Sequence, residues 1–152
     1  MNAPVPAATS PTTAAGGRTV YATTVTAVGP MVPEFVAAGV LVLFGEQAPQ
    51  ELHDFSVLHR VDGSLEPDAS GPLVGDVVRI GDVELPVLAV GSVVAGNLLN
   101  LGHLDLKADG RSEPAMPGDV CVPTGTLPPV EVGQSITIVR PASSGPQEGS
   151  AP

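Results

Sequence analysis

The chain has no tryptophan, one tyrosine and three phenylalanines among 152 residues. Because aromatic rings are scarce, valine and leucine must fill the core, and β-branched valine favours strands over helices. Cys121 is the only cysteine, which excludes an internal disulfide and a CxxC metal site, so we expect it to act as a small buried apolar residue. No apolar run approaches the ~18 residues of a membrane-spanning helix, and the N-terminus lacks the charged and apolar regions of a signal peptide. These absences predict a soluble, cytoplasmic protein.

Positive charge is also scarce. Six lysines and arginines stand against sixteen aspartates and glutamates, for a net charge of −10. Nucleic-acid binding depends on many cationic contacts with phosphates, so no nucleic-acid partner is predicted, and an electropositive protein partner fits better. No Walker loop, dinucleotide fingerprint or HExxH motif occurs, and therefore no cofactor or metal is predicted.

The length suits one domain between two tails. Residues 1–17, MNAPVPAATSPTTAAGG, are rich in Pro, Ala and Thr and have no periodic apolar face. Such a segment cannot bury enough surface to offset the entropy of ordering it, and residues 141–152 have the same character. We expect both ends to be disordered and residues 18–140 to form a single domain.

Short apolar or alternating stretches recur between Gly, Pro and Asp turn signals. They predict strands at Thr19–Val28, Val40–Phe44, Phe55–Val61, Val74–Ile80, Val83–Val90, His103–Ala108, Val120–Val122 and Ile136–Val139. Three other segments each predict a short helix or a bend: Met31–Ala38, Gln47–Asp54 and Gly91–Leu101. Seven or eight short strands with close turns indicate an all-β barrel or sandwich with one or two short helices.

An internal repeat favours the barrel. VTAVGPMV, Val25–Val32, matches VLAVGSVV, Val87–Val94, and VGDVVRI, Val74–Ile80, matches VGQSITI, Val132–Ile138. In the same order GVLVLF falls opposite GHLDLK, and SVLH opposite DVCV. We therefore expect two halves, at about residues 20–80 and 83–139, related by a pseudo-twofold axis. The barrel would be closed or partly open.

The repeat also singles out two histidines. His59 falls opposite Val122, and His103 falls opposite Val40, so each replaces an aliphatic residue that the scaffold can accommodate. That substitution is typical of a site added to a symmetric fold. In the predicted strand Phe55–Val61, alternation places His59 on one face with Phe55 and Val57. An imidazole there is either a hydrogen-bonded core group or a reactive nitrogen kept from bulk water.

His103, His53 and the nearby carboxylates have simpler interpretations as well. His103 shares its predicted strand face with Asp105 and Lys107, so a solvated position competes with a supporting role beside His59. His53 stands in a polar bend, where we expect it to be exposed. Glu46, Glu51 and Asp54 predict either a solvated face or an acidic rim for a basic partner.

The segments GVLVLFGEQAPQELHDFSVLH, VLAVGSVV, NLLNLGHLDLKADG and PGDVCV resemble the glucitol/sorbitol-specific IIA component of the bacterial phosphoenolpyruvate-dependent sugar phosphotransferase system. The resemblance covers about Tyr21–Ile138 and implies an all-β barrel of swapped-hairpin type. It also implies a cytoplasmic phosphotransferase component that receives a phosphoryl group on a histidine, which matches His59, from the carrier protein HPr.

The resemblance further implies that the group passes to a cysteine of a IIB component and then to sugar that enters through the IIC membrane channel. Association with this IIC complex would be the chain's only link to the membrane. We expect His103 to hydrogen-bond His59 or the phosphoryl group. Neutral imidazole offers a lone pair for attack on phosphorus. We expect backbone N–H groups, Ser56 and His103 to stabilise the added charge, and Val57 and Val61 to exclude water.

Two alternatives stay open from the sequence. The chain could be a noncatalytic β-barrel that binds or regulates a partner, and its halves could close within one chain or swap between two chains of a homodimer. The phosphocarrier hypothesis fails if the His59 ring is sealed inside, with both nitrogens bonded to the backbone and no concave approach.

Overall fold

The fold is a single nine-stranded sheet with two α-helices and one 3₁₀ helix, within residues 17–125 and 127–142 that the computed structural model describes. The strands are β1 (Arg18–Val28), β2 (Val40–Gly45), β3 (Val57–Val61), β4 (Val77–Ile80), β5 (Val83–Pro86), β6 (Ala89–Val90), β7 (Leu104–Lys107), β8 (Asp119–Cys121) and β9 (Ser135–Arg140). The helices are α2 (Val32–Ala37), η2 (Gln50–Phe55) and α3 (Val94–Leu101). The predicted all-β class is confirmed. The predicted tails lie outside the described residues, apart from Gly17, Pro141 and Ala142.

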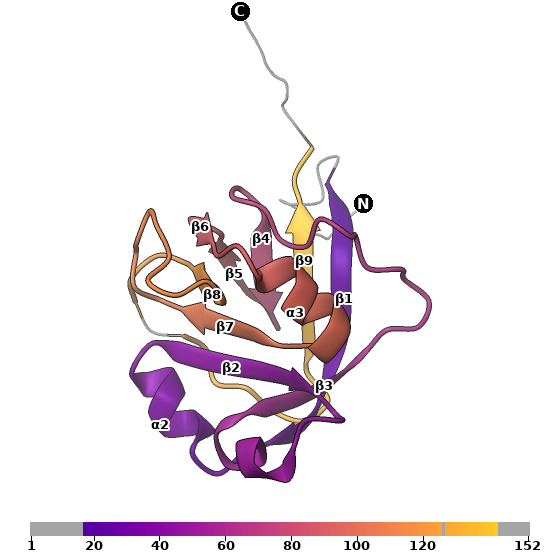
Figure 1. Ribbon diagram of the computed structural model, residues 1–152, viewed down its shortest axis with the longest axis vertical. Coiled ribbons are helices and arrows are strands. Elements are labelled where there is room, and N and C mark those ends of the chain that lie inside the picture. Colours follow the sequence, from indigo (N-terminus) through magenta and orange to yellow (C-terminus); the bar gives the residue numbers. More distant parts are fainter. Residues whose placement is uncertain (1–16, 126, 143–152) are drawn as a thin grey trace, which may run out of the picture.

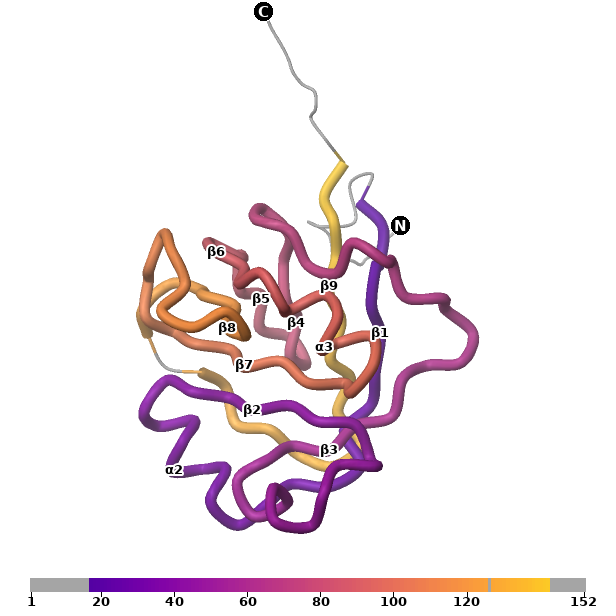
Figure 2. The backbone as a smooth tube through the Cα atoms, viewed as in Figure 1, coloured from indigo at the N-terminus to yellow at the C-terminus, as the bar shows by residue number. Residues whose placement is uncertain are grey.

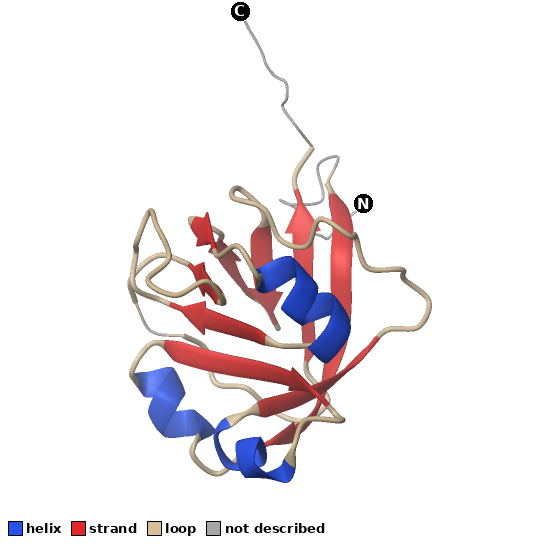
Figure 3. Ribbon diagram, viewed as in Figure 1, coloured by secondary structure: helices blue, strands red, loops and turns tan. Residues whose placement is uncertain are grey.

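The sheet curls back on itself. Its strand order is β5-β4-β9-β1-β3-β2-β7-β8-β6, and the two end strands are separated in the chain only by Val87 and Leu88. The chain therefore links both ends of the order within one molecule, as the trace in Figure 2 follows. In Figure 1, β2 and β7 run side by side across the middle, while β1 and β9 stand together on the right. Figure 3 shows α2 and η2 beside β2 and β3, and α3 in front of the sheet.

Strand register reveals the twofold axis. β2 and β7 are antiparallel, with Leu41 opposite Leu106 and Leu43 opposite Leu104. A shift of 63 residues, the spacing from Leu41 to Leu104, turns the first pair into the second. The parallel pair β2–β3 likewise corresponds to the parallel pair β7–β8. The predicted pseudo-twofold repeat is therefore present in the hydrogen bonding of the strands.

The core lies between the strand pair β2–β7 and the strand pair β4–β9. Buried aliphatic side chains of β2, β7, β4 and β9 meet there, together with Tyr21 and Leu98: Leu41, Leu43, Leu104, Leu106, Val78, Ile80, Ile136 and Ile138. The void left between them is only about 10 Å³. Full burial of each such side chain stabilises the fold by about 1.5–3 kcal/mol. Cys121 is fully buried as well, as predicted.

Two arginines fasten the long loop between β3 and β4 to the barrel wall. Arg140 of β9 makes a bidentate ion pair with Asp76 at 3.0 and 2.9 Å, and donates to the carbonyl of Gly71. Arg18 of β1 pairs with Asp68. Asp76 is nearly fully buried, so its charge needs this partner. The loop is thereby held beside α3, since a Cβ on Gly71 would meet Ala95 at 2.8 Å.

The stretch before β3 differs from the predicted strand. Phe55 ends η2, and its ring stacks on Phe35 with the centroids 5.9 Å apart. The 3₁₀ helix that starts after Pro49 includes Phe55, and β3 begins only at Val57, so Phe55 does not share the strand face of His59. His53 is also not fully exposed, because its Nε2 lies 2.8 Å from the carbonyl oxygen of Ala48.

Candidate functional site

His59 lies where β3 leaves the core. Along the inward face of this strand, the exposed fraction rises from 0% at Val57 through 2% at His59 to 37% at Val61. β1 lies on one side of β3, with Val25 opposite His59, and β2 on the other, with Gly45 opposite. The imidazole is thus held by two neighbouring strands at the mouth of the barrel.

Both ring nitrogens of His59 have hydrogen-bond partners. Nε2 lies 2.7 Å from the carbonyl oxygen of Gly102, and Nδ1 lies 2.6 Å from the hydroxyl oxygen of Thr23. A carbonyl only accepts, so Nε2 carries the proton and donates it, while Nδ1 accepts from the Thr23 hydroxyl. One nitrogen is therefore bonded to the backbone and the other to a side chain.

The environment keeps the imidazole neutral. Burial lowers the pKa of His59 below its usual 6.5, against smaller opposing effects of the Gly102 carbonyl and the Glu46 carboxylate. The edge of the buried Tyr21 ring faces the imidazole, with centroids 6.3 Å apart. A neutral ring at neutral pH has a lone pair, which a nucleophile requires.

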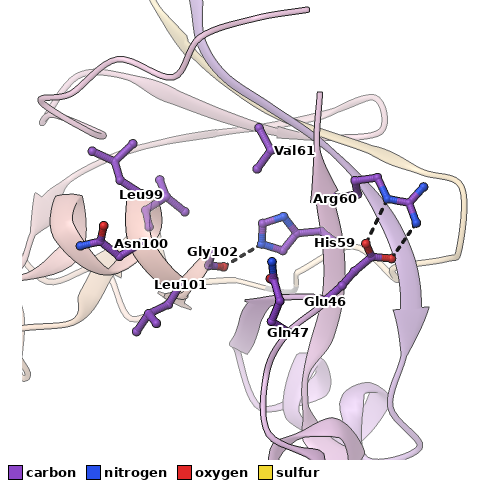
Figure 4. Close-up of a pocket in the computed structure, with 11 residues that line it drawn as sticks. Glu46, Gln47, His59, Arg60, Val61, Leu99, Asn100, Leu101 and Gly102 are labelled. Atoms are coloured by element: carbon purple, nitrogen blue, oxygen red, sulfur yellow. Dashed lines mark hydrogen bonds and ion pairs between the residues drawn. The ribbon is translucent and has the colours of Figure 1, made fainter. Parts of the chain in front are cut away.

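A cavity of about 240 Å³ adjoins the ring. It is lined by the end of β2 and the two residues after it, by β3 from His59 onward, and by the end and cap of α3: Gly45, Glu46, Gln47, His59, Arg60, Val61, Leu98, Leu99, Asn100, Leu101 and Gly102 (Figure 4). Gly102, the partner of Nε2, lines the cavity, whereas Thr23, the partner of Nδ1, does not. Nε2 is therefore the nitrogen on the cavity side, and a concave approach to His59 exists.

Gly102 places its carbonyl there because it caps α3. It adopts a left-handed conformation, φ 65°, and its N–H bonds the carbonyl of Leu98 at 3.0 Å. A Cβ at this position would lie 2.7 Å from the nitrogen of Gly45 and 3.1 Å from Nε2 of His59. Only glycine fits between the helix end, β2 and the imidazole.

One ion pair borders the cavity. Arg60 donates from Nε and Nη2 to the two carboxylate oxygens of Glu46, each at 3.0 Å. These hydrogen bonds are the main reason that the pKa of Glu46 lies below its usual value. Successive strand residues face opposite sides, and in Figure 4 the Arg60 side chain accordingly points away from the His59 ring.

His103 lies near the site but not in it. Its Nδ1 is 3.1 Å from the carbonyl of Leu43, its Nε2 is 3.5 Å from the Asp105 carboxylate, and its ring stacks on Phe44 with centroids 4.1 Å apart. Burial raises the pKa of Asp105, although His103 and Lys107 oppose that shift. The expected hydrogen bond from His103 to His59 is thus absent among the described residues. Any contact of His103 with a phosphoryl group stays a prediction.

Of the two valines that we expected to exclude water from the site, Val61 lines the cavity, but Val57 lies in the core and does not. The apolar wall comes instead from Leu98, Leu99 and Leu101 of α3. The hydroxyl of Ser56 is buried, has no hydrogen-bond partner among the residues that the structure describes, and does not line the cavity.

Thr23 and Gly102, the two partners of the His59 ring, were missed by sequence reasoning. Thr23 and Gly102 lie 36 and 43 residues from His59. The glycine that follows the predicted helical segment was the one available signal, since such glycines commonly cap helices.

The buried neutral imidazole predicts a pH dependence of stability. The pKa of His59 is lowered in the folded state, so below about pH 6.5 the unfolded chain binds a proton that the folded chain resists. We expect this residue to cost the protein up to about 1.4 kcal/mol of unfolding free energy between pH 7.5 and 5.5. Urea unfolding of wild type and His59→Val at both pH values measures it. An equal loss in the variant would contradict the assignment.

The barrel and this site define a class of protein. A solved structure described as a PTS system IIA component from Enterococcus faecalis V583 superposes with a TM-score of 0.64 and 26% identity, covering 76% of this chain and 96% of that one. Residues 20–137 match the family described as PTS system glucitol/sorbitol-specific IIA component. The PTS system glucitol/sorbitol-specific EIIA components of Shigella flexneri and Escherichia coli K12 are each 35% identical over 112 residues, 72% of this chain and 85% of theirs. The chain belongs to this family, and the resemblance noted from its sequence is confirmed.

Within the part of the chain that the structure describes, no helix is long and apolar enough to cross a membrane.

Proposed function

We propose that the protein is a phosphocarrier in which Nε2 of His59 accepts a phosphoryl group from HPr and passes it to a IIB component that serves glucitol or sorbitol uptake. The observation that carries this proposal is a neutral, buried imidazole whose Nε2 faces a cavity at the barrel mouth. Membership in the glucitol/sorbitol-specific IIA family supports the pathway and the sugar. Since HPr and the IIB component act in the cytoplasm, we place the protein there.

Before the transfer, the ring has to change its tautomer. Nε2 carries the proton in the resting state, so its lone pair becomes free only when the proton resides on Nδ1. The Thr23 hydroxyl can accommodate both states, because it donates to a bare Nδ1 and accepts from Nδ1–H. The Gly102 carbonyl then loses its donor and has to give way to the incoming phosphorus.

In the transfer, the Nε2 lone pair forms the new N–P bond. The P–N bond to the donor imidazole of HPr breaks, and its electron pair stays on that imidazole, which takes up a proton. The His59 ring releases the one it held, so charge and atoms balance. Little covalent chemistry is asked of the protein beyond in-line positioning and stabilisation of the transferred charge. The apolar wall of α3 would slow hydrolysis of the adduct.

The decisive experiment is phosphorylation by labelled phosphoenolpyruvate with enzyme I and HPr, followed by peptide mapping. We expect acid-labile label in the peptide that contains His59, and NMR of the adduct should identify Nε2. Absence of label with active HPr, combined with tight binding of the unlabelled chain to a transporter or regulator, would instead support a noncatalytic module.

His103 has a positioning role in this proposal. It follows Gly102, and its ring is fixed by Phe44 and the carbonyl of Leu43, so it holds the end of α3 against β2. We expect His103→Ala to slow labelling several-fold while the label still maps to His59, and His103→Phe, which can keep the stack, to recover part of the rate. Complete loss of label in a folded His103→Ala protein would instead make His103 a direct participant.

A further inference from the structure

The cavity beside Nε2 has few hydrogen-bond donors that could bind the oxygens of a phosphoryl group. Its walls carry the carbonyl of Gly102 and the carboxylate of Glu46, and the C-terminal end of α3, which has partial negative charge, also lines it. Phosphoryl oxygens are hydrogen-bond acceptors with up to two negative charges, so they need donors. The chain itself has a net charge of −10, so the added negative charge depends all the more on such donors.

Arg60 is the only lysine or arginine among the residues described as lining this cavity. Its guanidinium is already held by both oxygens of Glu46, and it points away from His59 (Figure 4). Use of Arg60 would require breaking a bidentate pair and turning the side chain past its own strand. Asn100 also lines the cavity, but in Figure 4 its carboxamide points away from the His59 ring. The resting geometry therefore favours another donor.

Gln47 satisfies the requirement. Its side chain points toward the His59 ring in Figure 4. Among the described residues, no hydrogen bond joins the Gln47 carboxamide to another group. The missing side chain at Gly45 makes room for it, because a Cβ there would lie 3.2 Å from Oε1 of Gln47 and 3.1 Å from the carbonyl oxygen of Leu101. Gln47 also lines a second cavity with Phe44 and Leu52, as do Asn100 and Leu101.

We propose that the Gln47 carboxamide donates a hydrogen bond to the phosphoryl group carried on Nε2 of His59. This inference rests on the proposed phosphocarrier function and names a further residue of the same site. A neutral donor suits a carrier, because the adduct must be stable enough to form and still be passed on. One hydrogen bond to a charged group corresponds to about a 10-fold change or more in an equilibrium constant.

The test compares how the phosphoryl group partitions between HPr and the chain in wild type, Gln47→Met, Gln50→Met and Arg60→Gln. Gln50 is the matched control, since it is also an exposed glutamine but does not line the His59 cavity. We expect Gln47→Met to shift the partition about 10-fold toward HPr and Gln50→Met to leave it within about 2-fold. The Gln47 side-chain amide signals in a ¹⁵N NMR spectrum should move on phosphorylation while those of Gln50 do not.

An unchanged partition in Gln47→Met, or unmoved Gln47 signals, overturns the inference while the carrier function stands, provided that wild-type His59 takes up label. A larger shift in Arg60→Gln than in Gln47→Met also overturns it, by assigning the contact to Arg60. Failure of wild type to accept any label overturns the carrier function and this inference together. Circular dichroism of each variant shows that a shifted partition does not come from unfolded protein.

Discussion

His59→Val is expected to abolish phosphorylation by HPr and leave a folded barrel. Valine removes the nucleophilic nitrogen, and it is the residue that the fold already holds at the equivalent position, Val122. Labelling with phosphoenolpyruvate, enzyme I and HPr measures the loss, and near-ultraviolet circular dichroism reports the fold. Label that persists at the wild-type rate would remove His59 from the mechanism.

The repeat also supplies the control for stability. Thr23, which bonds Nδ1 of His59, corresponds in the second half to Leu85, so Thr23→Leu with His59→Val copies the residue types at the two equivalent positions of that half. A buried Thr23 hydroxyl without its partner costs about 1–3 kcal/mol, and we expect the double variant to regain part of that loss. Urea unfolding of the single and double variants measures the difference.

Gly102→Ala is expected to reduce labelling at least about 10-fold and to lower the unfolding free energy by about 1 kcal/mol or more. The new methyl group would lie 2.7 Å from the nitrogen of Gly45 and 3.1 Å from Nε2 of His59, and alanine is strained at φ 65°. It would therefore displace the helix end or the imidazole. The initial rate of transfer from HPr, compared with wild type, gives the effect.

Gly39 is a close control for this variant. It is the counterpart of Gly102 in the other half, also left-handed at φ 84°, but a Cβ there would find its nearest neighbour, the Cβ of Ala108, at 3.6 Å. Gly39→Ala thus introduces the backbone strain without the clash, and we expect it to lose stability and keep its labelling rate. Equal labelling rates in the two variants would separate Gly102 from the chemistry.

Much of the fold followed from local patterns. Each apolar or alternating run became a strand, because side chains that alternate between core and solvent suit one pleated arrangement. The exceptions were Val83–Val90, which divides at Val87 and Leu88, Val74–Ile80, whose first three residues lie in a turn and loop before β4, and Phe55, which joins η2. Each exception lies where a strand gives way to a turn or connection, and the local period of a sequence does not specify where that happens.

The sequence by itself determined most of the strand set, the duplication, and the two histidines, His59 and His103, that replace aliphatic residues of the repeat. All three depend on residue types and their spacing along the chain. The tertiary structure alone decided that Thr23 and Gly102 bond the two ring nitrogens, that His103 bonds Leu43 rather than His59, and that Nε2 is the nitrogen on the cavity side. The physical reason is distance along the chain. Partners separated by 36 and 43 residues meet only after the sheet has curled and α3 has docked on it, and no local pattern specifies which atoms that closure brings within hydrogen-bond reach.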